Sequence, residues 1–150
     1  MRAYFFANSW LSGIQKGLQS AHVVAEMASS LTAADIDLES SDFLDWMRDH
    51  KTIVILDGGS HNDLRTLAAV FNDKDNPFVW DCFSEDEESL NGAMTCVGII
   101  LPERIYETAK ILREGPPYDS DKFAGGFWTE DFTEWEAELI KLLNSCPLAR

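Results

Sequence analysis

Residues 52–60 read Thr52-Ile53-Val54-Ile55-Leu56-Asp57-Gly58-Gly59-Ser60. The apolar run at 52–56 has no polar alternation, which is typical of a strand that is buried on both faces. The two glycines that follow predict a tight turn, and Ser60 with Asp63 three residues later matches the pattern that caps a helix. A buried strand that turns directly into a helix predicts an α/β fold.

The chain on either side repeats this alternation of strands and helices. Upstream we expect a strand at 3–7, a helix at 12–29 and a short helix at 41–50. The apolar stripe of the first helix should face the sheet, and it comprises Ile14, Leu18, Ala21, Ala25 and Ala28. Downstream we expect a helix at 60–71, strands at 78–83 and 93–101, and a helix at 103–113. A last amphipathic helix should follow Thr129. Together these elements predict a single domain over 1–150 with three layers, α/β/α.

Composition narrows the class of protein. The chain has 150 residues, 45% of them hydrophobic, which is enough to form the core of one domain. No apolar run reaches the ~20 residues of a membrane helix, and the start of the chain does not resemble a signal peptide. The three cysteines form no CxxC pair, so we interpret them as reduced thiols in a cytoplasmic protein.

The charge is strongly negative and unevenly distributed. The net charge is −14, and because residues 1–34 carry +1, residues 35–150 carry −15. Such a field repels nucleic-acid phosphates unless a local basic patch overrides it. The acidity is interpreted as serving solubility, with recognition of a basic protein partner as the alternative.

The first predicted helix carries the most informative polar residues. Polar residues recur there every three or four positions, so they would align on one face of the helix. They are Ser12, Gln15, Gln19, His22 and Glu26. Lys16 stands beside this set near the helix start. Amide, amine and imidazole groups on one face can hydrogen-bond a phosphate, an ester or a carbonyl, although polar residues on a helix commonly just face water.

Residues 12–22 resemble the first-helix motif of type 2 peptidyl-tRNA hydrolases, which reads approximately GKxAAQxxHA, with matches at Gln19 and His22. Further along, 51–56 resembles the second strand of that family, and Phe78-Val79-Trp80-Asp81 resembles the strand that ends in an aspartate. Thr95 to Pro102 resembles its closing strand. The resemblance covers roughly 3–102, so residues 103–150 would form a helical C-terminal extension.

This resemblance implies a mixed four-stranded sheet with helices on both faces, and hydrolysis of the ester that joins a peptide to the 3′ end of tRNA. It implies site roles for the position-matched residues Gln19, His22, Asp81 and Thr95. With the neighbouring polar residues added, we expect catalysis by Lys16, Gln19, His22 and Asp81, and binding by Asn8, Gln15, Asn91 and Thr95. In such a site the aspartate orients a water, and the amide and amine stabilise the oxyanion. The scheme needs no metal and no cofactor.

The sequence also departs from the family pattern. Gln15 stands where the family has its lysine, and Lys16 is displaced by one residue. The Ala-Gly-Arg-Thr that follows the family aspartate is replaced by residues 82–85, which lead into an acidic loop at 84–88. We expect this loop to be a solvated turn, since it lacks the glycine of an EF-hand metal site.

Two other functions therefore stay open. One is a non-catalytic binding module of the same fold, which uses the helix face and the acidic surface to bind a protein partner or a small ligand. The other is an oligomer-forming structural protein, such as a homodimer, in which the C-terminal helix supplies the contact.

Overall fold

A single four-stranded sheet organises the molecule. The computed structural model describes residues 1–33, 41–114 and 132–149. Its strands are β1 (Arg2–Ala7), β2 (Ile53–Asp57), β3 (Trp80–Ser84) and β4 (Met94–Leu101), in the order β2-β1-β4-β3. β1 pairs with β2 in parallel and with β4 antiparallel, and β3 pairs antiparallel with β4. The predicted α/β class and the expected mixed sheet are confirmed.

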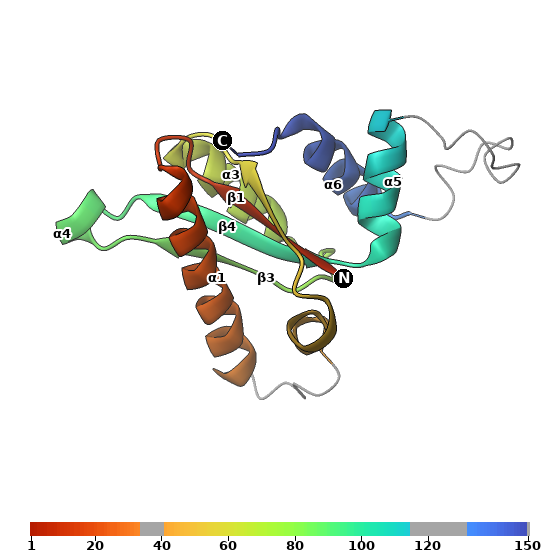
Figure 1. Ribbon diagram of the computed structural model, residues 1–150, viewed down its shortest axis with the longest axis horizontal. Coiled ribbons are helices and arrows are strands. Elements are labelled where there is room, and N and C mark those ends of the chain that lie inside the picture. Colours follow the sequence, from red (N-terminus) through yellow and green to blue (C-terminus); the bar gives the residue numbers. More distant parts are fainter. Residues whose placement is uncertain (34–40, 115–131, 150) are drawn as a thin grey trace, which may run out of the picture.

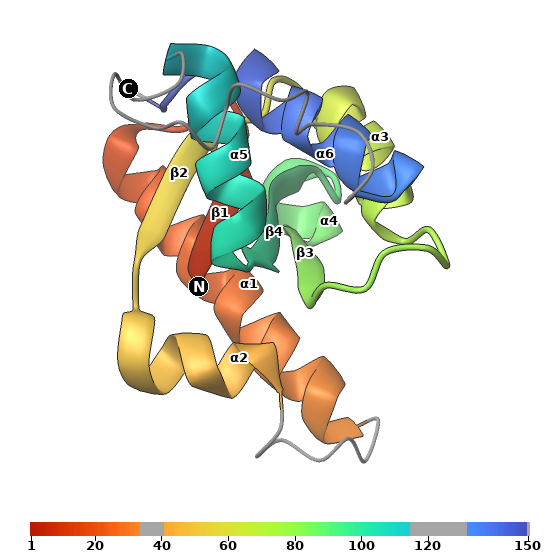
Figure 2. The same ribbon diagram turned by 90° about the vertical axis from the view of Figure 1, so that its right-hand side faces the viewer.

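Helices cover both faces of this sheet (Figures 1 and 2). One face is covered by α1 (Gly13–Ala33), by α2 (Asp42–Asp45) and by the π-helical turn η2 (Trp46–His50) that continues it. The other face is covered by α3 (His61–Phe71), α5 (Glu103–Glu114) and α6 (Glu134–Ser145). A single turn, α4 (Glu87–Leu90), lies between β3 and β4. The described elements therefore form three layers.

The helix starts follow from side-chain capping. In α3, Ser60 accepts from the backbone N–H of Asp63 while the Asp63 carboxylate accepts from the backbone N–H of Ser60, so the predicted capping box is confirmed. Thr133 and Glu136 form the same reciprocal pair at α6. We expected the cap of that last helix at Thr129, which lies outside the described residues.

Alternation along the strands divides the core in two. On β1, Tyr4 and Phe6 face α3, α5 and α6, whereas Ala3 and Phe5 face α1 and α2. Leu139, Ile140 and Leu143 of α6 belong to the same buried cluster as Phe6. The predicted C-terminal extension thus contributes directly to the core.

The prediction of which face of α1 packs against the sheet is wrong. Ile14 is 88% exposed and Leu18 55% exposed, and the side chains that face the sheet are Lys16, Gln19, Ser20, Val23, Met27 and Leu31. These residues also repeat at intervals of three and four, so the helix carries two competing stripes. Val23, Met27 and Leu31 remove more apolar surface from water than alanines can, so they set the orientation of the helix. Lys16 and Gln19 are buried as a result.

The prediction that the second strand is buried on both faces is wrong, because β2 is an edge strand and Ile53 is 51% exposed. The end of the chain partly covers this edge. The backbone N–H of Asp57 donates to Pro147 O at 2.9 Å, and the backbone N–H of Ala149 donates to Ile55 O at 2.9 Å. This pairing satisfies edge groups that would otherwise be open to strand addition. Among the helices that the structure describes, none is long and apolar enough to cross a bilayer.

Candidate functional site

Buried polar residues gather at the carboxyl end of β1, where the chain turns into α1. Asn8, Lys16, Gln19, Ser20 and Thr95 are each at most 5% exposed. Crevices at the carboxyl ends of strands are common ligand sites in α/β proteins. Buried polar groups are costly unless they are satisfied, so this concentration marks the region as a candidate site.

Asn8 ties three segments together at this point. Its backbone N–H donates to Thr95 O at 2.9 Å, and its Nδ2 donates to Met94 O at 3.3 Å, both on β4. Its Oδ1 accepts from the backbone N–H of Trp10 at 3.2 Å, which shapes the turn into α1. Asn8 therefore positions the site.

Gln19 is the centre of the buried network. Its Nε2 donates to Glu85 Oε1 at 2.7 Å, and its Oε1 accepts from Thr95 Oγ1 at 2.8 Å. The amide is thereby fixed in orientation, with one N–H directed to a carboxylate and the second N–H still able to donate. The structure brings together two predicted residues, Gln19 and Thr95, and adds Glu85, which the sequence marked only as part of an acidic loop.

Lys16 lies on the same face of α1 as Gln19, one turn earlier, and only 4% of it is exposed. Displacement by one residue from the family position therefore does not remove it from the buried face. Its positive charge acts on Asp57, the last residue of β2. The buried face of α1 thus carries an amine, which acts on the end of β2, and an amide, which is bonded to Glu85.

Asp57 is held as a carboxylate. Hydrogen bonds from the Ser9 hydroxyl and from the backbone N–H of Gly59 lower its pKa, and the charge of Lys16 lowers it further. Ser9 also donates its backbone N–H to Gly59 O at 2.8 Å. The turn after β2, which the sequence predicted to be structural, is therefore bonded to the start of the candidate site.

This arrangement predicts a pH dependence of stability. Because the folded-state pKa of Asp57 is depressed, its contribution is present above the ordinary aspartate pKa and is lost as the pH falls through the depressed value. We expect Asp57→Asn to lower Tm at neutral pH, and the gap to wild type to close as the solution is acidified. Thermal unfolding followed from neutral to acid pH measures this gap. A gap independent of pH would contradict the assignment.

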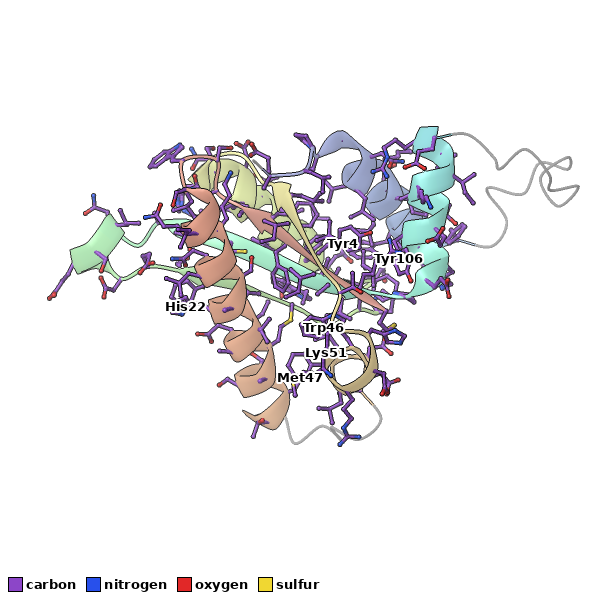
Figure 3. All side chains as sticks on the ribbon, in the orientation of Figure 1. Tyr4, His22, Trp46, Met47, Lys51 and Tyr106 are labelled. Atoms are coloured by element: carbon purple, nitrogen blue, oxygen red, sulfur yellow. The ribbon has the colours of Figure 1, made fainter. Side chains whose placement is uncertain are left out.

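His22 lies outside the buried network. It is exposed on α1 (Figure 3), and its ring stacks on Phe83 of β3 with centroids 4.4 Å apart and an interplanar angle of 16°. One helical turn separates it from Gln19, so it flanks the site.

Asp81 is far from Gln19. Its carboxylate accepts from Ser30 Oγ at 2.7 Å and from the backbone N–H of Cys82 at 2.8 Å. Ser30 lies about three helical turns beyond Gln19, which is ~16 Å along the axis of α1. The pairs Ser30–Asp81, His22–Phe83 and Gln19–Glu85 follow one another in order, so α1 runs antiparallel to β3. The carboxylate beside Gln19 is therefore Glu85, and the structure does not bring Asp81 there.

Gln15 and Asn91 have local roles. Gln15 is exposed, and its Oε1 accepts from the backbone N–H and the hydroxyl of Ser12, each at 2.9 Å, at the start of α1. Asn91 is exposed and caps α4 with a φ of 52°, a left-handed conformation that asparagine tolerates. Within the described part of the chain, neither side chain is hydrogen-bonded to Gln19, Thr95 or Glu85.

A further feature of the described residues is the arrangement of possible metal ligands and the state of the thiols. Within the ranges that the structure describes, no three His, Cys, Asp or Glu side chains are grouped as metal ligands. All three cysteines are free, and burial raises the pKa of Cys96 to about 12, so this thiol stays protonated. The usable groups are an amine, an amide and carboxylates.

Comparison of the sequence with protein-family models and with curated proteins gave no match.

Proposed function

We propose that this protein is a hydrolase of the type 2 peptidyl-tRNA hydrolase kind, which cleaves the ester between a peptide and the 3′ end of tRNA. One observation carries the proposal: Lys16 and Gln19 are buried on one face of α1, and Gln19 is bonded to both Thr95 and Glu85. The motif resemblance at residues 12–22 supports the same assignment. A tRNA substrate and unpaired cysteines agree with a cytoplasmic location.

The proposed reaction uses Glu85 in the role first expected of Asp81. Water attacks the ester carbonyl while Glu85 accepts a proton from it, and a new C–O bond forms as the carbonyl oxygen becomes an oxyanion. The second N–H of Gln19 and the amine of Lys16 stabilise that oxyanion. The intermediate then collapses, the bond to the ribose oxygen breaks, and Glu85 returns the proton to the leaving oxygen.

A non-catalytic binding module is the second candidate, and a groove between α1 and β2 favours it. The groove has a volume of about 340 Å³ and an apolar lining that comprises Gly17, Ser20, Ala21, Val24, Trp46, Ile53 and Ile55. Exposed Ile14 and Leu18 extend the apolar surface along α1. With a net charge of −14, the matching occupant is an apolar segment of a basic protein.

Turnover of peptidyl-tRNA by the purified full chain separates the two candidates. We expect the wild type to release peptide, and Gln19→Ala to be slower by about 10²-fold because the oxyanion loses a donor. Asn72→Ala removes an exposed amide at the end of α3 and should turn over like the wild type. Absence of turnover by the wild type at high protein concentration would reject the hydrolase and leave the binding module.

A further inference from the structure

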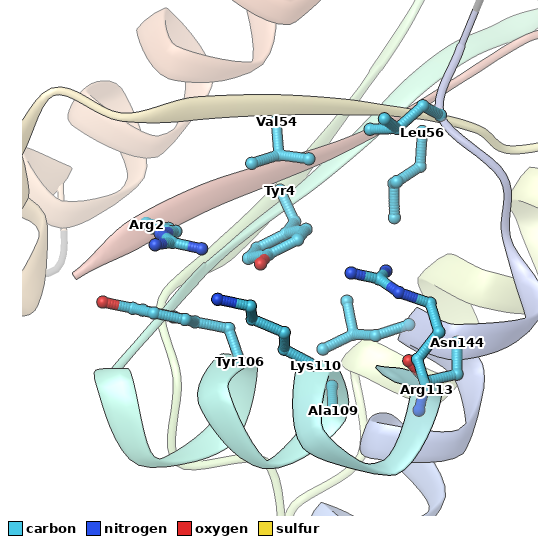
Figure 4. Close-up of a pocket in the computed structure, with 11 residues that line it drawn as sticks. Arg2, Tyr4, Val54, Leu56, Tyr106, Ala109, Lys110, Arg113 and Asn144 are labelled. Atoms are coloured by element: carbon cyan, nitrogen blue, oxygen red, sulfur yellow. The ribbon is translucent and has the colours of Figure 1, made fainter. Parts of the chain in front are cut away.

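A second cavity lies on the opposite face of the sheet, between β1, β2, α5 and α6 (Figure 4). Its volume is about 190 Å³. Tyr4 and Tyr106 form part of the cavity wall. In Figure 3 they lie near α5, whereas His22 lies on another side of the molecule. The lining residues are Arg2, Tyr4, Val54, Leu56, Tyr106, Ala109, Lys110, Arg113, Leu143, Asn144 and Leu148. The cavity is therefore separate from the candidate hydrolase site.

The charge of this cavity opposes that of the whole chain. Arg2, Lys110 and Arg113 line it, and among its described lining residues none is Asp or Glu. The chain has only 12 Lys and Arg against 26 Asp and Glu, so three cations around one small cavity form a local positive field in an acidic protein. Such a field attracts a small anion.

The carboxylates paired with Arg2 and Arg113 lie outside the lining. Glu107 is 3.7 Å from Arg2, and Glu114 is 3.0 Å from Arg113, with every side chain of these pairs at least 36% exposed. Exposed ion pairs of this kind contribute little free energy, because water and salt screen them. An anion that enters the cavity can therefore compete for the same guanidinium groups.

The walls supply further hydrogen-bonding groups. Burial raises the pKa of the Tyr4 phenol, which keeps it a neutral donor. The guanidinium of Arg2 lies 4.0 Å from the centroid of the Tyr106 ring, which fixes its orientation at the cavity edge. Asn144 Oδ1 is buried without a hydrogen-bond partner among the described residues, so a hydroxyl on a ligand would satisfy it.

We propose that this cavity binds a small phosphate monoester. Its phosphoryl group would be held by Arg2, Lys110 and Arg113, whose side chains surround Tyr4 in Figure 4, and its short hydroxyl-bearing body would lie toward Asn144 and the apolar wall. The volume is below the ~300–1,000 Å³ of pockets for drug-sized ligands, which favours a small occupant over a nucleotide or a peptide.

Calorimetric titration of the full chain tests the proposal, with inorganic phosphate and glycerol 3-phosphate as separate probes at matched ionic strength. We expect saturable binding. Tighter binding of the ester than of inorganic phosphate supports the proposal, and equal binding of the two probes would overturn the assignment of an organic phosphate. Lys110→Gln and Arg113→Gln should each weaken binding by about tenfold, since each removes one charge-assisted contact.

Lys141→Gln is the matched control, because Lys141 lies on α6, is 70% exposed and is paired with Glu138 outside the cavity. It should bind like the wild type. The proposal is overturned if neither probe binds saturably to the wild type, or if Lys141→Gln weakens binding as much as Lys110→Gln does.

Discussion

Glu85→Gln is expected to slow the proposed hydrolysis of peptidyl-tRNA by about 10²–10⁴-fold, the usual range for loss of a general base. The substitution keeps the size of the side chain and its carbonyl can still accept from Gln19 Nε2, the contact that is 2.7 Å in the wild type. It removes only the ability to take a proton from water. The rate should therefore fall in kcat, with KM nearly unchanged, in steady-state assays of peptide release.

Glu87→Gln provides the control for charge. Glu87 is exposed on α4, two residues further along the same acidic segment, and its loss changes the net charge equally. If the acidic loop acts only by repelling tRNA, both variants should change KM alike. Equal rates for Glu85→Gln and wild type would remove Glu85 from the proposed mechanism.

Phe71→Ala is expected to lower the free energy of unfolding by about 3–5 kcal/mol, the range for a fully buried phenylalanine. Phe71 is 0% exposed, and its ring centroid lies 5.9 Å from that of Phe6, 6.2 Å from Trp80 and 6.4 Å from Trp135. These contacts join α3 to the sheet and to α6. Truncation would leave a cavity between α3, α6 and the sheet.

Urea unfolding measures this loss, and Val70→Ala is the neighbouring control. Val70 is 43% exposed on the same helix, so its truncation should cost within about 0.5 kcal/mol. A loss below about 1 kcal/mol for Phe71→Ala would show that Phe71 is not packed between the sheet and α6 as described.

The sheet was predictable because its signal is local. Each strand is a short apolar run bounded by a turn, as in residues 52–59, and the four strands fall close to the predicted ranges. The short helix α4 (Glu87–Leu90) lies where a loop was expected. The face of α1 was not predictable from spacing, since two stripes at helical intervals were present. Only packing against the sheet selects Val23 and Met27 over the alanines.

Part of the site was predictable because local sequence motifs mark two of its residues. Gln19 and Thr95 were marked by the motif, and the structure joins them at 2.8 Å across 76 positions of sequence. Glu85 was obscured by the acidic residues around it, and a register irregularity between Phe83 and Ser84 makes strand alternation a poor guide to its direction. Asp81 matched a motif, but its distance from Gln19 depends on the antiparallel path of α1 along β3.

Glutamine side-chain NMR tests the central claim most directly. The chain contains two glutamines, so labelling their amide nitrogens gives signals from Gln19 in the proposed site and from Gln15 at the exposed start of α1 as an internal reference. The titrant is a 3′-terminal tRNA fragment that carries a peptide through an uncleavable amide. We predict a saturable shift of the Gln19 signal with Gln15 little changed. A Gln19 signal that stays in place at saturating fragment would contradict the proposed site.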